Sequence, residues 1–282
     1  MLEATELTRL VVNKTVVPER RGRGRRGYGR RPAVRLLVYA QLKGIHRDAR
    51  LVKHLQENPE VAGLLGLNGI PDRTTIERWR KRLSRIFEKA FQKLSEYVQM
   101  LVPTEDLIVD STPLEDYQDP DARWGKYSRG WFKGFKEHFS VNQLELPLKT
   151  KVTTGNRHDS PFLPELIGEL GPNRVLTDAG YDSGSNRKAC RKVGATPHIA
   201  RNPRNTGENY RLSKVLKKGR SAVERFNSRL KEMLQGSWQR FKGLTRKATV
   251  IYLGLIAMTA IALHGLILGE QDLIRKVSLY RD

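Results

Sequence analysis

The stretch RVLTDAGYDSGSNRKACRKVGATPHIA, residues 174–200, decides the fold class. Its first residues, 174–176, form a short apolar run that predicts a strand, and residues 197–200 predict a second one. Between them, residues 185–193 have the spacing of a helix. A strand, a helix and a strand in this order are typical of an α/β domain.

Three further short runs upstream of this stretch extend the predicted sheet. Residues 107–109, 135–141 and 148–154 are rich in β-branched and aromatic side chains, which predicts three adjacent strands. A short helix is expected after them, around Leu163 and Ile167. We therefore expect an α/β domain with a mixed five-stranded sheet and flanking helices.

A helix is also expected downstream, over residues 219–231. Val223, Phe226 and Leu230 form an apolar stripe on it, and a second stripe is polar. The polar stripe consists of Arg220, Glu224, Asn227 and Lys231. An ordinary row of surface charge pairs, each worth tenths of a kcal/mol, would explain this second stripe equally well.

Two aspartates directly follow predicted strands. Asp110 comes after residues 107–109, and Asp178 after residues 175–177. Functional groups in an open α/β sheet gather at the carboxyl edge of its strands, so these two carboxylates can meet there. Taken singly, each aspartate is as readily explained as a turn former.

Several segments together resemble the catalytic-domain blocks of bacterial and archaeal insertion-sequence transposases, in that family's order. They are IVDST at 108–112, GFKEH at 134–138, TGNRHDS at 154–160 and LTDAGYDS at 176–183. The family's Tyr-x2-Arg-x3-Glu-x6-Lys signature is similar to the pattern of Arg220, Glu224 and Lys231. The tyrosine position of the signature holds Lys217 instead.

This resemblance implies an RNase H-like fold and a DDE transposase with the catalytic, metal-binding carboxylates Asp110, Asp178 and Glu224. By the same resemblance Asp110 would bridge two ions, and Arg220 and Lys231 would contact phosphates. Two unit charges about 4 Å apart repel by roughly 4 kcal/mol at an effective dielectric near 20, so clustered carboxylates need divalent cations. We expect Mg2+ or Mn2+, two ions in all.

Other acidic and histidine side chains lie near these blocks. Asp159 and His138 are expected in the second shell of the site, and His138 and His158 more as structural histidines than as ligands of a transition metal. The remaining nearby acids are expected to have solvent or turn roles; they are Glu115, Asp116, Asp119, Asp121 and Asp182.

The charge of the chain predicts a polyanionic partner. Its 52 lysines and arginines against 30 acidic residues give a net charge of +22, which favours double-stranded DNA. Residues 126–136 interleave aromatic and basic residues, a composition suited to phosphate contact and stacking on an unpaired base. Arg129, Lys133 and Lys136 are the expected DNA contacts there, and residues 201–220 form a second basic stretch.

Residues 1–100 are predicted to form a helical DNA-binding domain, and residues 101–282 the catalytic domain. Thr74 is expected to cap a helix, with Glu77 completing a capping box. That helix would carry Arg78, Arg80 and Arg82 on its exposed side and present Arg78 and Arg82 to DNA in a helix-turn-helix arrangement, although a plain amphipathic helix fits the same pattern. Residues 20–31 contain seven arginines and predict a flexible basic arm.

The protein is expected in the prokaryotic cytoplasm, near the nucleoid. The single cysteine, Cys190, excludes an internal disulfide framework, and the N-terminus lacks the apolar core of a secretory signal. Residues 248–268 are long and apolar enough to span a membrane. We expect them instead to form a buried helix that covers the sheet.

Two other functions compete with the transposase. The alternative is a catalytically inactive, transposase-derived DNA-binding protein, which Lys217 at the tyrosine position would favour. The second competing function is that of a nuclease or resolvase of the same fold, which cuts DNA without joining it. For the transposase itself we expect the terminal inverted repeats and target DNA as partners, a homodimer or larger assembly on DNA, and no membrane.

Overall fold

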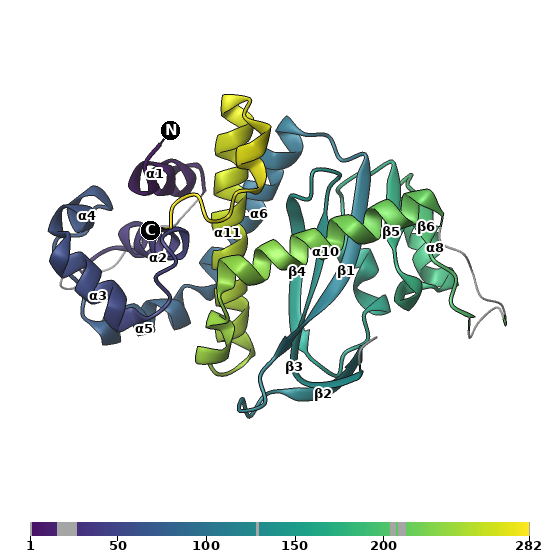
Figure 1. Ribbon diagram of the computed structural model, residues 1–282, viewed down its shortest axis with the longest axis horizontal. Coiled ribbons are helices and arrows are strands. Elements are labelled where there is room, and N and C mark those ends of the chain that lie inside the picture. The colour runs from purple at the N-terminus through teal and green to yellow at the C-terminus, as the bar shows by residue number, and fades with distance from the viewer. Residues whose placement is uncertain (1, 16–26, 128–129, 204–206, 208–212, 282) are drawn as a thin grey trace. The chain divides into compact units, whose positions relative to one another are not determined.

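The computed structural model describes residues 2–15, 27–127, 130–203, 207 and 213–281 (Figure 1). The chain divides into two compact units. The first, which we call the helical unit, contains residues 1–94, 229–241 and 245–282. The second, the sheet unit, contains residues 95–228 and 242–244.

The sheet unit is built on a mixed sheet of six strands in the order β2-β3-β1-β5-β6, with β4 also pairing β3. The strands are β1 (Asp106–Glu115), β2 (Arg123–Tyr127), β3 (Gly130–Val141), β4 (Pro147–Thr154), β5 (Arg174–Thr177) and β6 (Thr196–Ile199). The pairs β1-β3, β2-β3 and β3-β4 are antiparallel, whereas β1-β5 and β5-β6 are parallel. This is the expected RNase H-like α/β fold.

The predicted number of five strands is wrong by one. The additional strand is β2, which forms a hairpin with the first part of β3. Its sequence, RWGKY, alternates exposed side chains with a buried glycine, so it has no apolar run that would predict a strand. The five strands expected from the sequence are all present.

Helices cover the sheet within this unit. They are α7 (Leu163–Ile167), α8 (Gly184–Lys192) and the first part of α10 (Lys214–Leu234), which includes the helix expected over 219–231. Figure 1 shows α10 lying across the sheet. Phe226 of α10 packs on Phe139 of β3 with ring centroids 4.7 Å apart. A β-carbon at Gly219 would lie 2.9 Å from the Leu176 side chain, so a glycine lets α10 approach β5 closely.

The helical unit contains α1 (Ala4–Lys14), α2 (Arg30–Leu42), α3 (Asp48–Glu57), α4 (Pro59–Leu64), α5 (Arg73–Arg82), the first part of α6 (Ser84–Leu101) and nearly all of α11 (Leu244–Leu268). Segments far apart in sequence meet in its core. The Gln41 side chain donates to the Met233 carbonyl at 2.7 Å. The Tyr280 hydroxyl and His264 Nδ1 are hydrogen-bonded at 3.1 Å.

Helix α5 corrects two expectations. Its N-cap is Asp72, whose carboxylate accepts from the backbone N–H of Thr75 at 2.8 Å, so the cap lies two residues before the expected Thr74. Arg80, expected on the exposed side, is buried and pairs with Asp48 at 2.9 Å. Arg78 and Arg82 are exposed as expected.

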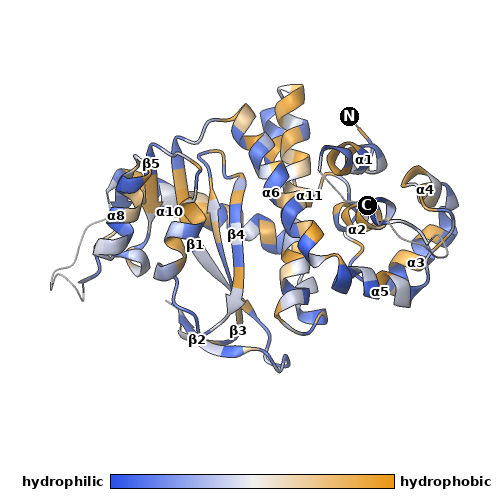
Figure 2. Cartoon of the chain, turned by 180° about the vertical axis from the view of Figure 1, so that it is seen from behind, coloured by the Kyte–Doolittle hydropathy of each residue, from blue (hydrophilic) through white to orange (hydrophobic). Residues whose placement is uncertain are grey.

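Helix α11 is the apolar segment that is long enough to cross a membrane. Its most apolar window is 89% buried inside the protein, as in the core helix of a soluble protein. Figure 2 shows the apolar colouring along α11. Tyr252 packs on Phe91 of α6 with centroids 6.1 Å apart, and Gly254 lies against Leu230 and Leu234 of α10. Burial is confirmed, and α11 groups with the helical unit, while its expected cover of the sheet stays a prediction.

The compact units also differ from the expected division into residues 1–100 and 101–282. Residues 229–241 and 245–282 group with the N-terminal helices rather than with the sheet. The cause is the apolar surface of α11, which is buried against helices. The assignment of DNA binding to the N-terminal part stays a prediction, and residues 20–26 of the basic arm lie outside the described residues.

Candidate active site

Two aspartates from neighbouring parallel strands meet at one edge of the sheet. In the β1-β5 register Ile108 pairs with Leu176, so Asp110 and Asp178 each lie two residues beyond that pair. Asp178 directly follows β5, as expected. Asp110 is not at a strand end, because β1 continues to Glu115 as the antiparallel partner of β3. It instead stands where the parallel pairing ends, which still brings it to Asp178.

The electrostatics of this edge are unfavourable for two ionised carboxylates. Burial, and then the charge of Asp178, raise the pKa of Asp110 to about 8. Burial and the charge of Asp159 raise the pKa of Asp178 as well. The backbone N–H of Gly180, which donates to Asp178 at 2.9 Å, partly opposes this rise. Arg220 opposes both shifts. A site that penalises its own charge is suited to bind a cation.

Asp159, expected in the second shell, joins this pair of carboxylates. Its charge raises the pKa of both Asp110 and Asp178. Lys136 donates to it at 3.0 Å and to the Arg157 carbonyl at 3.1 Å. The structure therefore brings three aspartates into electrostatic range of one another, with a buried lysine bonded to the third.

His138 is a structural histidine, as expected. It is fully buried, and its Nε2 and the Thr153 hydroxyl are hydrogen-bonded at 2.9 Å. Its Nδ1 lies 3.5 Å from Asp159. Burial lowers the pKa of His138 to about 4, so the ring is neutral at pH 7. His138 thus supports Asp159 without adding a charge.

Glu224 is on α10, the helix that packs across the sheet. Its side chain is 64% exposed and pairs with Arg220 at 3.1 Å. Glu224 is not among the groups that shift the pKa of Asp110 or Asp178, whereas Arg220 is. Arg220 therefore connects the predicted third carboxylate to the aspartate pair.

Tyr181 is a candidate that the sequence patterns missed. Its side chain is buried, and its hydroxyl has no hydrogen-bond partner among the described residues. Burial and the charges of Asp110, Asp159 and Asp178 raise its pKa well above 10. The only sequence indication was its place three residues after Asp178, inside the segment LTDAGYDS.

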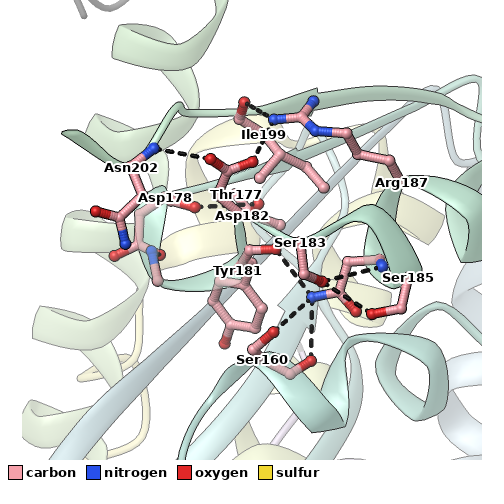
Figure 3. A network of polar contacts seen from close by, with 12 residues as sticks. Ser160, Thr177, Asp178, Tyr181, Asp182, Ser183, Ser185, Arg187, Ile199 and Asn202 are labelled. Atoms are coloured by element: carbon pink, nitrogen blue, oxygen red, sulfur yellow. Dashed lines mark hydrogen bonds and ion pairs between the residues drawn. The ribbon is translucent and has the colours of Figure 1, made fainter. Parts of the chain in front are cut away.

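A polar network fixes the segment that carries Asp178 and Tyr181 (Figure 3). Asp182 accepts from the Asn202 N–H at 2.8 Å and from Arg187 at 2.7 Å. Asn186 holds the Tyr181 carbonyl at 2.9 Å. In Figure 3 the Tyr181 ring extends away from Asp182 and Arg187, so its hydroxyl stays outside this network.

Asp116 and Asp119 have the expected turn role, because each accepts from the backbone N–H two residues on, at 3.1 and 2.9 Å, and both make longer-range contacts as well. Asp116 and Asp119 are buried. Asp116 pairs with Lys242 at 3.2 Å, and Asp119 accepts from the N–H of Gly243 at 2.8 Å. Asp182, also expected in solvent or a turn, belongs to the network above.

The predicted DNA contacts differ in their exposure. Arg78, Arg82, Arg220 and Lys231 are exposed and can reach a phosphate. Lys133 is half-buried, with its Nζ 3.4 Å from the Tyr117 carbonyl. Lys136 is buried against Asp159, so a surface phosphate contact is a wrong expectation for it. Arg129 lies outside the described residues.

The donor atoms at this edge fit a divalent cation in kind. Carboxylate oxygens are the ligands that Mg2+ prefers, and the raised pKa of Asp110 shows that negative charge there lacks compensation. Among the described residues, however, no group of three acidic, histidine or cysteine side chains stands ready to hold a metal ion.

Two family profiles match this chain. The profile of the family described as Transposase DDE domain matches residues 103–260, and that of Transposase domain (DUF772) matches residues 3–82. The transposase for insertion sequence element IS1106 of Neisseria meningitidis serogroup B is 30% identical over 151 residues, which are 51% of this chain and 48% of that protein. The chain thus spans about half the length of that curated relative. No solved structure matches significantly.

Proposed function

Because this chain belongs to the family of transposase DDE domains, we propose that it cuts DNA at the ends of an insertion element and joins the exposed 3′-hydroxyls to target DNA. The name of the similar neisserial protein supports an insertion sequence as the setting. The observation that carries the proposal is the approach of Asp110 to Asp178 where the β1-β5 pairing ends. Burial, and then the charge of Asp178, raise the pKa of Asp110 there to about 8.

Asp110, Asp178 and Glu224 would hold the divalent ions, Mg2+ or Mn2+ and two in number, with Asp110 shared. Ions bound there would activate a water molecule or a 3′-hydroxyl and stabilise the leaving oxygen. With a pKa near 8, the Asp110 carboxyl is largely protonated at pH 7 in the absence of metal. Its proton is released when a cation takes its place.

Arg220 interacts with both Glu224 and the aspartate pair. It pairs with Glu224 on the exposed face of α10, and its charge also lowers the pKa of Asp110 and Asp178. If Glu224 held a cation, the Arg220 guanidinium would be free of that pair and would offer a planar pair of donors to a phosphate of the bound DNA.

Asp159 is proposed as a positioning residue. Lys136 and His138 both contact its carboxylate, at 3.0 and 3.5 Å. Lys136 fixes this carboxylate, which keeps a negative charge close to Asp110 and Asp178 and so strengthens the demand for cations at the sheet edge. Its role is electrostatic rather than a direct contact with DNA.

The helical unit is proposed to bind the element's ends through the exposed arginines of α5, Arg78 and Arg82. Lys231 adds a phosphate contact on α10. Double-stranded DNA, as terminal inverted repeats and as target, is the proposed partner, and two or more copies of the chain would assemble on it. Such a protein would act in the cytoplasm, at the nucleoid.

The test uses oligonucleotides taken from inverted repeats that flank the gene. Asp110→Asn, Asp178→Asn and Glu224→Gln should each abolish cleavage with Mg2+, because each removes a cation ligand. Binding to the same DNA should stay within a few-fold. Glu165→Gln is the matched control. It removes an exposed acid of α7 that pairs with Lys151 of β4, and this variant should cleave like the wild type.

The products separate the proposal from its alternatives. Products longer than the substrate indicate strand transfer, whereas shortened products alone indicate a nuclease. Binding without cleavage by the unsubstituted chain would contradict the proposal and favour an inactive DNA-binding protein. Near-normal cleavage by any of the three carboxylate variants would remove that residue from the site.

A further inference from the structure

The hairpin of β2 and β3 presents an unusual outer face. In its register Trp124 pairs with Lys133, and Lys126 pairs with Trp131. Because paired residues point to the same side of a sheet, the face alternates aromatic and basic side chains on both strands. We call these four residues, together with Tyr117, the hairpin platform.

The aromatic side chains of the hairpin platform are open to solvent. Trp124 is 57% exposed, Trp131 66% and Tyr117 54%. Tyr117 packs edge-on against Trp124 with centroids 6.0 Å apart. The Lys126 ammonium lies 5.7 Å from the centre of the Trp131 ring. Large aromatic surfaces left in water at neighbouring positions mark an interaction site rather than a core.

The opposite face of the hairpin holds the platform firmly. Phe132 is fully buried and packs edge-on against Tyr127 at 5.5 Å. A β-carbon on Gly125 would lie 2.1 Å from the Gly155 carbonyl oxygen, so the strand touches the turn after β4. The platform is thus displayed on a backbone packed against the rest of the sheet unit.

The charge around the platform selects its partner. Residues 122–136 contain five basic residues and no acidic one. Of the four acids just before them, Asp116 and Asp119 are buried and bonded to residues 242 and 243, Glu115 is half-buried and accepts from Tyr127, and Asp121 is exposed. An apolar protein partner would leave Lys126 and Lys133 facing an apolar surface. A polyanion with flat apolar rings satisfies both kinds of side chain.

We propose that the hairpin platform binds an unpaired strand of DNA, with bases stacked on Trp124 and Trp131 and phosphates held by Lys126 and Lys133. Duplex DNA hides its base faces and offers the aromatic rings nothing to stack on, so the platform distinguishes a single strand from a duplex. The inference rests on the proposed function and adds that part of the bound DNA is single-stranded.

The platform lies apart from the reactive carboxylates. Phe139, which pairs with Asp110, is eight residues along β3 from Trp131. At about 3.3 Å per residue this is a separation of roughly 26 Å. The platform therefore holds a strand that leads away from the cut, and the side chains of the platform take no part in bond breaking.

The experiment measures binding of the full chain to oligothymidylate of about 15 nucleotides, near the largest site of single-strand binding domains, and to a random duplex of equal length. Trp131→Ala should weaken binding to the single strand by roughly 10-fold, and Trp124→Ala by a similar factor, because each removes a stacking partner. Duplex binding should change less than about 2-fold. Ile267→Ala, equally exposed at 66% but on α11, is the control.

Two further measurements test stacking itself. Trp131→Tyr keeps an aromatic ring and should restore most of the affinity. A 2-aminopurine base within the oligothymidylate should lose fluorescence on binding to the wild type and less on binding to Trp131→Ala. Equal losses for single strand and duplex, or an unchanged 2-aminopurine signal, would overturn the inference. Thermal melting checks that each variant is folded.

The outcome is separable from that of the proposed function. Asp110→Asn should bind oligothymidylate as the wild type does, since Asp110 is remote from the platform. Cleavage of element ends with no effect of the tryptophan variants on single-strand binding would refute the platform alone. Single-strand binding that depends on Trp131, without any cleavage, would refute the proposed reaction alone.

Discussion

The buried charges of the helical unit and those at the carboxylate edge of the sheet unit differ in their partners. In the helical unit, Arg80 has Asp48 at 2.9 Å, and the buried Lys247 donates to the Trp238 carbonyl at 2.7 Å. In the sheet unit, Asp110 has Asp178 as a neighbour of like charge, and the hydroxyl of Tyr181 has no partner among the described residues. Buried polar groups are normally matched. A buried pair of like charges, with its raised pKa, is instead typical of a site shaped by function.

The most severe way to remove this difference is to place an unmatched charge in the helical unit. Leu255 of α11 is fully buried. Leu255→Asp should cost about 4 kcal/mol or more, because an isolated carboxylate there has no compensating group. Loss of soluble folded protein, followed by circular dichroism, is the expected result. Ile267→Asp, on the exposed end of the same helix, should behave like the wild type.

A protein that carries Leu255→Asp and melts normally would show that α11 is not a core helix. Recovery of the unsubstituted chain only with detergent would favour the membrane interpretation instead.

A milder change removes one partner of the buried ion pair between Arg80 and Asp48. Arg80→Met should destabilise the protein by roughly 3 kcal/mol, because Asp48 then remains partly buried without its partner. The midpoint of urea unfolding measures the change. The double variant Arg80→Met with Asp48→Leu should recover most of the loss, since no charge is left unpaired. A double variant no better than the single one would mean that packing, not charge, is lost.

Because Asp110 and Asp178 are buried together with like charge, removing the charge of Asp110 is predicted to stabilise the protein. With its pKa raised to about 8, Asp110 binds a proton in the folded state that the unfolded state releases near pH 4. The folded state therefore loses stability as pH rises from about 4 to 8. Asp110→Asn removes this loss and should be more stable at pH 8, by on the order of 2 kcal/mol.

Thermal melting in the presence of a chelator at pH 5 and pH 8 gives the comparison. The two proteins should differ most at pH 8, and Mg2+ should stabilise the wild type there but not the variant. Parallel pH profiles for both proteins would show that Asp110 ionises normally.

The smallest expected effect concerns Tyr181. Tyr181→Phe removes a buried hydroxyl that has no partner, so the metal-free protein should become more stable by about 1 kcal/mol. Differential scanning calorimetry resolves a change of this size. A loss of stability would mean that the hydroxyl is hydrogen-bonded in solution and belongs with the matched groups.

Much of the site follows from local sequence. An aspartate after an apolar strand, repeated on two strands, predicts a common edge because parallel strands share their direction. The meeting of Asp110 with Asp178 could therefore be predicted before the register was known. The helix of Glu224 was equally clear from its apolar stripe of Val223, Phe226 and Leu230.

What the patterns missed depends on partners far along the chain. Arg80 and Lys136 look like surface cations until Asp48 and Asp159 are placed beside them. Strand β2 has no apolar run that would predict it, and it forms only because it pairs with β3 across the hairpin. The partner of α11 could not be predicted either, since an apolar helix fits a sheet and a helical core equally well.

The division of the helical unit between the two ends of the sequence has a consequence for biosynthesis. Its N-terminal helices need residues 229–241 and 245–282 to complete their core, as the bond between Gln41 and Met233 illustrates. At the usual ribosomal rate of about 5–20 residues per second, residues 95–282 take roughly 10 to 40 s to make. During that time the first helices wait with exposed apolar surface, near the messenger that is still being translated. A nascent chain thus completes its helical unit only once residues 245–282 have been made.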